Sequence, residues 1–304
     1  MPELPEVETV VRTLRPLVAG RRILGAELCG TGKMGQAPPA ILRILADPPQ
    51  KFRQAVCGAF IEDLERYGKN IVFHLRPRHG PRHEKTKSLD LWIHLGMTGR
   101  LTCENTAEPR TRHTHLILSL DEPGRWLHYA DIRQFGRLRL GNGLGAPTEE
   151  LGPDPLEIPF EEFFDRLRVR QAMLKSLLLD QRFLRGVGNI YADEGLFRAG
   201  LHPRAHAARL SRKQARALYC GMQETLQEAI EFRGSSISNY VDAQGRPGSF
   251  QRLHQVYRRT GQPCFRCGAR IRKILIASRS THFCPRCQRA GGMTRNKSSG
   301  RTTR

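Results

Sequence analysis

The sequence predicts an α+β protein of several domains, and three observations carry that prediction. A helical apolar repeat opens the chain, short β-type runs follow from about residue 21 to 140, and helical periodicity returns between residues 160 and 232. Four cysteines in two pairs then indicate a small metal-binding module near the C-terminus. With 304 residues, 39% of them apolar, the chain has enough material for two globular cores besides that module.

The N-terminal part combines one helix with many strands. Apolar residues recur at helical spacing over residues 5–18, and Pro5 suits the first turn of that helix. Runs such as residues 71–75, 91–95 and 115–118 are separated by glycine, proline and charged turns, which predicts an antiparallel sandwich or barrel. The basic segment 76–88 between two runs is predicted to be a mobile loop. A glycine- and proline-rich stretch ends this domain at about residue 145.

The second half contains a helix, a glycine turn and another helix. We expect helices over residues 171–181 and from Ile190 onward, joined by a turn that contains Gly186 and Gly188. Asn189 is predicted to cap the second helix, whose free N–H groups then offer an anion site for a phosphate. An ordinary helical hairpin is the alternative interpretation. Residues 233–250 are rich in glycine and serine, which favours a loop that covers a substrate.

The cysteine pairs predict a structural zinc site. Cys264 and Cys267 form one CxxC pair and Cys284 and Cys287 form another, with sixteen residues between the pairs. This spacing is typical of tetrahedral four-cysteine zinc sites, whereas two redox pairs would need no such hairpin-length segment between them. Four thiolates leave zinc no open position, so we expect one zinc ion that holds the hairpin rather than one that catalyses.

The charge predicts a polyanionic partner. Fifty Lys and Arg stand against 29 Asp and Glu, a net charge of +21. Residues 201–304 hold 21 basic and 4 acidic side chains, so most of the excess lies in the last third of the chain. Nucleic acid is favoured over an anionic membrane surface. No run approaches the roughly 18 apolar residues of a membrane-spanning helix, and the acidic, proline-rich start is unlike a signal peptide, so we expect a cytoplasmic protein.

The first residues offer a nucleophile. Removal of Met1, expected before a small residue, leaves Pro2 with a secondary amine, and an α-amino group titrates near pH ~8, low enough to be partly neutral at pH 7. Such an amine forms an iminium with a sugar aldehyde carbon. Glu3 and, one helical turn later, Glu6 are candidate acid and base groups beside it. The alternative is that these acids only favour the dipole of the helix.

These motifs together resemble the formamidopyrimidine-DNA glycosylase family, bacterial base-excision enzymes for oxidised purines. The resemblance rests on the start Met-Pro-Glu-Leu-Pro-Glu-Val-Glu-Thr, on residues 94–99, 131–136 and 186–194, and on the four-cysteine finger, all in the family's order. It covers residues 1 to about 288. It implies an N-terminal β-sandwich with an N-terminal helix (residues 1–145), a linker (146–159), a helix-two-turn-helix domain with a lesion-covering loop (160–250), a zinc finger (251–288) and a basic disordered tail (289–304).

The resemblance also implies roles for individual residues. Pro2 would attack C1′ of the damaged nucleotide, Glu3 would act as its acid/base group, Lys69 would assist β-elimination, and Arg279 would serve δ-elimination. The residues that match the family's DNA contacts are His113, Arg133, Arg170 and Asn189, and those that match its duplex-entering side chains are Met97, Arg133 and Phe135. Buried Met97 and Phe135, or a hydrogen-bonded strand histidine at 113, are the structural alternatives. The implied function is a bifunctional glycosylase and abasic-site lyase that acts on 8-oxoguanine and formamidopyrimidines in double-stranded DNA, as a monomer in the bacterial cytoplasm near the nucleoid.

Three other functions are weighed against this one. The related endonuclease VIII type has the same chemistry but oxidised pyrimidines as substrates, and Leu4 and residues 240–250 argue against it. A non-catalytic zinc-finger protein that binds lesions would not need the Pro2–Glu3 pair or Lys69. A ribosome-associated protein would explain the charge but not the acidic start. The sequence departs from the family pattern at Ile132 and Gln134 and on both sides of Lys69, which leaves strand affinity open.

Overall fold

The structure is a computed structural model that describes residues 1–29, 39–77, 89–108, 111–142, 151–237 and 239–289. The predicted basic loop and C-terminal tail fall almost entirely outside these residues, as does the first part of the predicted linker. Within the described residues, no helix is both long and apolar enough to cross a membrane.

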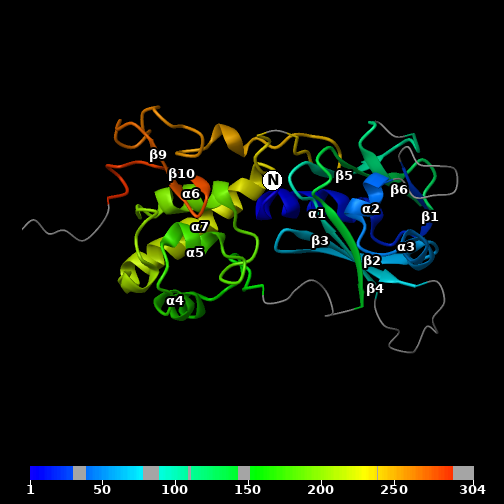
Figure 1. Ribbon diagram of the computed structural model, residues 1–304, viewed down its shortest axis with the longest axis horizontal. Coiled ribbons are helices and arrows are strands. Elements are labelled where there is room, and N and C mark those ends of the chain that lie inside the picture. The colour runs from blue at the N-terminus through cyan, green and yellow to red at the C-terminus, as the bar shows by residue number, and fades with distance from the viewer. Residues whose placement is uncertain (30–38, 78–88, 109–110, 143–150, 238, 290–304) are drawn as a thin grey trace, which may run out of the picture.

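The predicted N-terminal helix is confirmed as α1 (Leu4–Val18). Glu3 and Glu6 form a capping box at its start, in which the side chain of Glu6 accepts the Glu3 N–H, and Pro5 lies in the first turn. Leu4 packs into the core of the helical domain, whereas Val7, Val10 and the later apolar residues pack into the core of the sandwich. Because α1 contributes to both cores, its first turn lies at the junction of the two halves (Figure 1).

The N-terminal domain is an antiparallel β-sandwich, which decides between the sandwich and barrel alternatives. One sheet has the order β1-β6-β7-β5 and the other β2-β3-β4-β8, and α2 (Pro39–Ile44) and α3 (Pro49–Val56) lie at its side. The strands are β1 (Ile23–Leu28), β2 (Phe60–Tyr67), β3 (Asn70–Arg76), β4 (Leu89–His94), β5 (Gly99–Glu104), β6 (Thr114–Leu120), β7 (Trp126–Asp131) and β8 (Arg137–Asn142). β3 and β6 contain the predicted runs 71–75 and 115–118, and β4 contains the predicted run 91–95 except its last residue.

The second half is helical as predicted, with α4 (Phe160–Arg168), α5 (Leu174–Leu179), α6 (Asn189–Arg198), the 3-10 turn η1 (Ala207–Arg209) and α7 (Arg212–Glu231). The helix predicted over residues 171–181 is shorter at both ends. Ala172 and Met173 instead pair with residues 206–207 in strand-like fashion, because the carbonyl of Ala172 accepts the Ala207 N–H at 2.9 Å. Local periodicity does not reveal that long-range partner.

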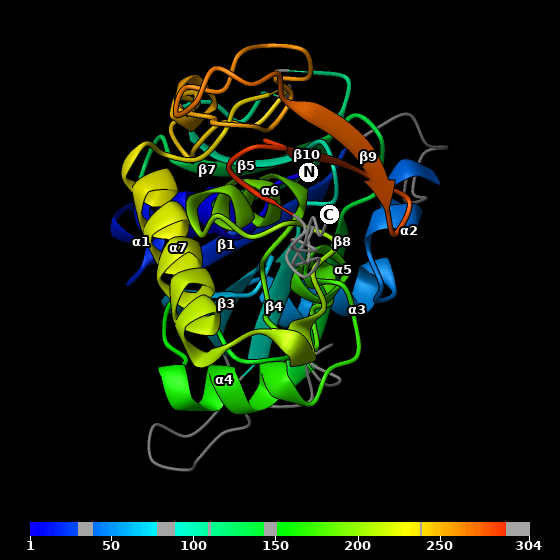
Figure 2. The same cartoon turned by 90° about the vertical axis from the view of Figure 1, so that its left-hand side faces the viewer.

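The C-terminal residues return to the N-terminal domain and then form the finger. Tyr240 and Ala243 are buried in the sandwich core, and Ala243 accepts a hydrogen bond from the Cys103 N–H at 2.8 Å. After η2 (Phe250–Arg252), strands β9 (Arg272–Ile276) and β10 (Arg279–Phe283) form the finger hairpin. β10 contacts α6, and Figure 2 shows the hairpin lying over that helix. The loop and the finger therefore bring residues from the end of the chain to the start of α1.

Candidate functional site

A cavity of about 620 Å³ lies where the start of α1, the sandwich, the helical domain and the finger meet. Eight of the candidate catalytic and DNA-binding residues selected from the sequence line it: Pro2, Glu3, Glu6, Lys69, Met97, Arg133, Asn189 and Arg279. They come from widely separated segments of the chain, so only the folded protein brings them together.

Glu3 is held at the N-terminus of α6. Its carboxylate accepts the N–H of Ile190 at 3.1 Å and that of Tyr191 at 3.4 Å. Gly188 allows this approach, because a Cβ there would overlap the carboxylate. The predicted N-cap is therefore wrong, because Gly188 and not Asn189 caps the helix. The N–H groups of Ile190 and Tyr191 bind the protein's own carboxylate, and a phosphate contact of Asn189 stays a prediction. The attraction of a helix N-terminus for anions was correctly anticipated, but the anion was not.

Pro2 is buried beside Glu3 and lines the cavity. While Met1 is attached, the nitrogen of Pro2 belongs to a peptide bond and is no nucleophile. Met1 is 49% exposed, so an aminopeptidase can reach it. Its removal would convert a buried amide into a secondary amine that faces the cavity.

Glu6 is a second buried carboxylate in the same cavity. It accepts the hydroxyl of Tyr191, the N–H of Ser235 at 2.7 Å and the N–H of Glu3 at 2.8 Å. Burial and the negative charge of Glu3 raise the pKa of Glu6 to about 7, although these hydrogen bonds favour its charged form. Glu6 therefore exchanges a proton near neutral pH.

Lys69 follows Gly68 in the turn between β2 and β3. Burial lowers the pKa of Lys69, and Arg279 lowers it further, against the opposing charges of Glu3 and Glu6. Gly68 has φ +61°, and a Cβ there would lie 3.3 Å from the Cβ of Arg185 in the helical domain. The lysine thus lies at a close contact between the domains, where burial favours its neutral form more than water would.

Met97, Arg133 and Phe135 lie on two adjoining turns of the sandwich. The carboxylate of Asp131 joins these turns, since it accepts the hydroxyl of Thr98 at 2.5 Å and the Gly136 N–H at 2.8 Å. Met97 is 39% exposed and Phe135 51%, which excludes the alternative that they form the sandwich core. The guanidinium of Arg133 stacks on the Phe135 ring at 4.5 Å. Three long side chains are therefore presented together beside the cavity.

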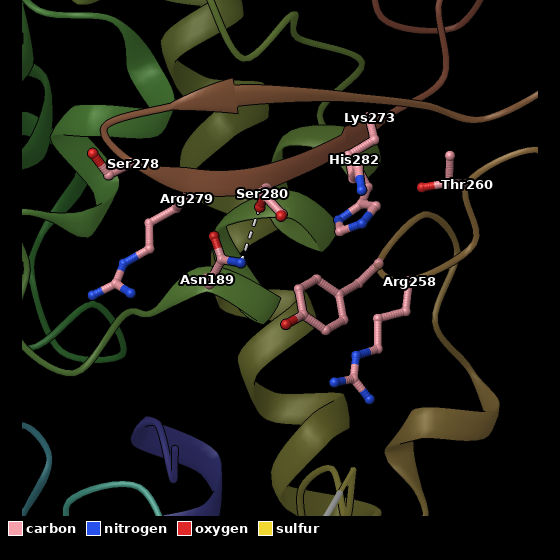
Figure 3. A pocket seen from close by; sticks show the side chains of 9 residues that line it. Asn189, Arg258, Thr260, Lys273, Ser278, Arg279, Ser280 and His282 are labelled. Atoms are coloured by element: carbon pink, nitrogen blue, oxygen red, sulfur yellow. Dashed lines mark hydrogen bonds between the residues drawn. The ribbon is translucent and has the colours of Figure 1, made fainter.

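Asn189 and Arg279 join the helical domain to the finger. The Asn189 side chain donates to the carbonyl of Ser280 at 3.0 Å, and both Asn189 and Arg279 also line an adjoining cavity of about 590 Å³ (Figure 3). Arg279 follows a tight turn in which Ala277 and Ser278 have φ +49° and +57°, as in a type I′ hairpin turn.

His113 and Arg170 do not line either cavity. His113 is partly exposed before β6, where its carbonyl accepts the Asp131 N–H at 3.0 Å. Arg170 is exposed between α4 and α5. Their DNA contacts stay predictions.

The sequence assigned no role to five further residues of the site: Ser235, Tyr240, Tyr257 and Arg258, which line the cavity, and Tyr191, whose hydroxyl donates to Glu6. Tyr191 lies inside the 186–194 motif, two positions after Asn189. Its place in the first turn of a helix that was predicted to begin at the site is the signal that could have identified it. The others lie on the 233–250 loop and in the segment that precedes the finger, where no periodicity gives a direction.

The four finger cysteines fit a zinc ion. Their Sγ atoms all lie within 4.8 Å of one another, with Cys264–Cys287 at 3.9 Å and Cys267–Cys284 at 3.4 Å. Zn–S bonds of ~2.3 Å in a tetrahedron place sulfur atoms about 3.8 Å apart. The finger therefore binds a structural zinc ion through Cys264, Cys267, Cys284 and Cys287, as predicted. The zinc supplies no chemistry to the cavity, and its ligands hold the hairpin that carries Arg279.

Family models match three consecutive parts of the chain. They are the formamidopyrimidine-DNA glycosylase N-terminal domain (residues 1–138), the formamidopyrimidine-DNA glycosylase H2TH domain (151–241) and the zinc finger found in FPG and IleRS (261–290). The chain belongs to the formamidopyrimidine-DNA glycosylase family. The resemblance seen in the sequence is thereby confirmed.

Individual relatives agree with this family over their whole length. Formamidopyrimidine-DNA glycosylase of Solibacter usitatus is 48% identical over 95% of the chain and all of that protein, and that of Bacillus subtilis is 40% identical over 95% of the chain and 99% of that protein. The fold matches the Lactococcus lactis Fpg in complex with an abasic site containing DNA, at a TM-score of 0.81 and 33% identity over 94% of this chain and 99% of that one. The MutM (FPG) protein of Thermus thermophilus matches at a TM-score of 0.78 and 40% identity over 94% of this chain and 98% of that one.

Proposed function

We propose that this protein is a bifunctional DNA glycosylase and abasic-site lyase of base-excision repair that removes oxidised purines from double-stranded DNA. One observation carries the proposal: Pro2, Glu3, Lys69 and Arg279 line a single cavity, and the Glu3 carboxylate is fixed there by the start of α6. The proposal places the protein in the bacterial cytoplasm, where the chromosome is, and as a monomer whose single chain supplies the complete site.

The first step is the displacement of the base. The neutral amine of Pro2 attacks C1′, the glycosidic bond breaks with its electron pair going to the base, and the amine loses its proton. The C1′–O4′ bond of the sugar then breaks, O4′ takes a proton, and the nitrogen lone pair forms the C1′=N iminium. Glu3 is the proposed acid/base group because it adjoins Pro2, and Glu6, with a pKa of about 7, is a buried group able to hold the released proton. The nucleotide must leave the stack to reach this depth, at a cost of a few (~3) kcal/mol.

The second step cuts the strand. Lys69, whose pKa is lowered by burial, is proposed to remove a C2′ proton from the iminium, which expels the 3′ phosphate in β-elimination. Arg279 is proposed to bind phosphate and to support the δ-elimination that expels the 5′ phosphate. We propose that Met97, Arg133 and Phe135 enter the duplex and offset the unstacking, as their exposure beside the cavity favours. Asn189, His113 and Arg170 are proposed DNA contacts.

Borohydride trapping tests this function. Protein with Met1 confirmed absent is incubated with a duplex containing 8-oxoguanine opposite cytosine, reduced, digested and mapped by mass. An adduct on Pro2 is expected. An adduct on Pro2 that forms only with an oxidised-pyrimidine duplex would move the substrate to the endonuclease VIII type. No adduct with either duplex, despite binding, would leave a lesion-binding protein without catalysis.

A further inference from the structure

Arg258 occupies a backbone position that disfavours its side chain. A β-turn of residues 256–259 is closed by the Arg259 N–H, which donates to the Val256 carbonyl at 3.1 Å. Arg258 is the third residue of this turn and has φ +59°, the left-handed region in which glycine is preferred. A large charged side chain there has to be explained by what the side chain does.

The guanidinium of Arg258 has no acidic partner in the part of the chain that the structure describes. Among the described residues it forms no hydrogen bond or ion pair, and its side chain is exposed. Its positive charge acts on Tyr257 and His254. The pKa of His254 is lowered to about 4 by burial first and by the charge of Arg258 second, so that this histidine is neutral. An exposed cation in such surroundings is available to an external anion.

Arg258 lies where three cavities adjoin. It lines the cavity that contains Pro2, the finger cavity that contains Arg279, and a third cavity of about 440 Å³ that is lined mainly by residues 251–265. The acidic residues among the described residues of these linings are Glu3 and Glu6, and both are buried and hydrogen-bonded. Figure 3 shows Arg258 and Arg279 on opposite sides of Asn189, each extending away from the hairpin.

We propose that Arg258 is a further DNA-binding residue, which holds a second backbone phosphate of the strand whose nucleotide enters the cavity, beside the phosphate held by Arg279. This proposal rests on the proposed function, since it takes the ligand of the cavity to be a DNA strand. The shared lining assigns the phosphate to the damaged strand, because both arginines face the cavity that receives its nucleotide. A guanidinium fork is suited to phosphate oxygens.

The variant Arg258→Gly tests the proposal without endangering the fold. Glycine removes the charge and also suits φ +59°, so weaker binding cannot be ascribed to a strained turn. Arg233→Gly is the matched control, since Arg233 is exposed, has φ +58° and lines none of the three cavities. Each variant loses one positive charge at a residue whose backbone is in the left-handed conformation.

The measurement is the Kd of zinc-loaded, full-length protein for a duplex with a tetrahydrofuran abasic analogue, at several salt concentrations. We expect Arg258→Gly to weaken binding about tenfold and to reduce the slope of log K against log salt by about 0.9, the value for one phosphate. Arg233→Gly should keep the wild-type slope. Equal behaviour of the two variants would overturn the proposal, and failure of the wild type to bind this duplex would overturn the proposed function as well.

Uncharged methylphosphonates identify the phosphate. Each is placed singly at phosphates flanking the lesion, in either strand, and combined with Arg258→Gly. A methylphosphonate at the contacted phosphate should weaken DNA binding by the wild type about tenfold. It should hardly change DNA binding by Arg258→Gly, because the two changes remove the same contact. Coupling at a phosphate of the damaged strand supports the assignment. Coupling in the undamaged strand, or at no phosphate, overturns it.

Discussion

At the scale of single residues, two carboxylates of the first helical turn occupy different environments. Glu3 is bound by the backbone N–H groups that open α6, whereas Glu6 lies deeper, with the hydroxyl of Tyr191 and the N–H of Ser235 on one oxygen. Different environments give neighbouring carboxyl groups different proton affinities. One short acidic motif can therefore supply both a fixed charge at the nucleophile and a group that titrates near neutral pH.

Glu6 should make stability depend on pH. Its pKa is raised from 4.5 to about 7, so between these values the folded protein binds more protons than the unfolded chain. Stability from this group is complete below pH ~4.5 and is lost as pH rises through ~7, by about 3 kcal/mol. His254, with its lowered pKa, acts in the opposite direction, so the comparison must be made against Glu6→Gln.

The measurement is urea unfolding of wild type and Glu6→Gln at pH 5, 6, 7 and 8. The variant loses an acceptor for the Glu3 N–H, which lowers stability equally at each pH. Relative to the variant, the wild type should lose stability as pH rises. Parallel curves would show that Glu6 does not titrate in this range.

Gly188 should be essential for the position of Glu3. Its φ of −132° suits any residue, so alanine there strains no backbone, but its Cβ would overlap the Glu3 carboxylate. Displacing a reacting group by about 1 Å can lower a rate ~100-fold. We expect Gly188→Ala to lose about that factor in single-turnover base release while it still binds abasic-analogue duplex. Gly20→Ala is the control: at φ +80° alanine strains the backbone, but its Cβ meets no atom within 4 Å, so the rate should be kept. An active Gly188→Ala would contradict this geometry.

Residue identities were predicted better than their partners. The sequence indicated Pro2 and Glu3 through the N-terminal motif and Lys69 through the family resemblance of residues 66–69, because both segments are continuous in the chain. It placed a phosphate at the start of α6 because nothing in the local pattern shows that Glu3, 187 positions away, takes those N–H groups. Arg258 was missed because a left-handed arginine in an irregular segment has no periodic signature.

At the scale of elements, the β2–β3 hairpin is held against the helical domain by buried charges. Arg66 at the end of β2 lies 2.8 Å from Glu8 of α1 and 2.7 Å from Asp154, and Arg185 stacks on the ring of Tyr67 at 4.3 Å. The turn that carries Lys69 follows directly. The predicted strands and first helix were confirmed because alternation and the 3.6-residue period are local, whereas this attachment joins residues far apart in the chain and leaves no such pattern.

Removing Asp154 should therefore destabilise the junction of the domains. Asp154→Ala leaves Arg66, whose side chain is 7% exposed, with one of its two acidic partners. Breaking a buried pair from one side costs ~3–5 kcal/mol, and the remaining contact with Glu8 places this case at about 3 kcal/mol. Urea unfolding measures it, with Asp165→Ala as control, since Asp165 and Arg168 form an exposed pair. Equal effects of the two variants would mean that Arg66 is solvated rather than paired.

At the scale of the whole molecule, three cores of unequal size hold the site together. The sandwich and helical cores are large, but the finger core consists of Phe197, Val256, Ile271 and two of the zinc-binding cysteines. So few apolar residues cannot order a finger without its metal. Arg279 and the Asn189–Ser280 contact belong to this weakest part, and the proposed chemistry thus depends on a metal that does not take part in it.

Removal of zinc should therefore abolish strand cutting before it unfolds the protein. A chelator is expected to disorder the β9–β10 hairpin and to weaken DNA binding, because Arg279 and Lys273 lose their fixed places beside the cavity. The other two cores contain no zinc ligand, so the main thermal unfolding transition should persist. Its midpoint should fall only by the contribution of the contacts between β10 and α6. Circular dichroism, zinc analysis and borohydride trapping before and after chelation measure this, with re-added zinc restoring the adduct.

Cys220→Ser, which alters a thiol outside the finger, should respond to chelator as the wild type does. If metal-free protein trapped abasic DNA as efficiently as the zinc form, the finger would be dispensable for the site, and the catalytic cavity would have to be complete within the sandwich and the helical domain alone.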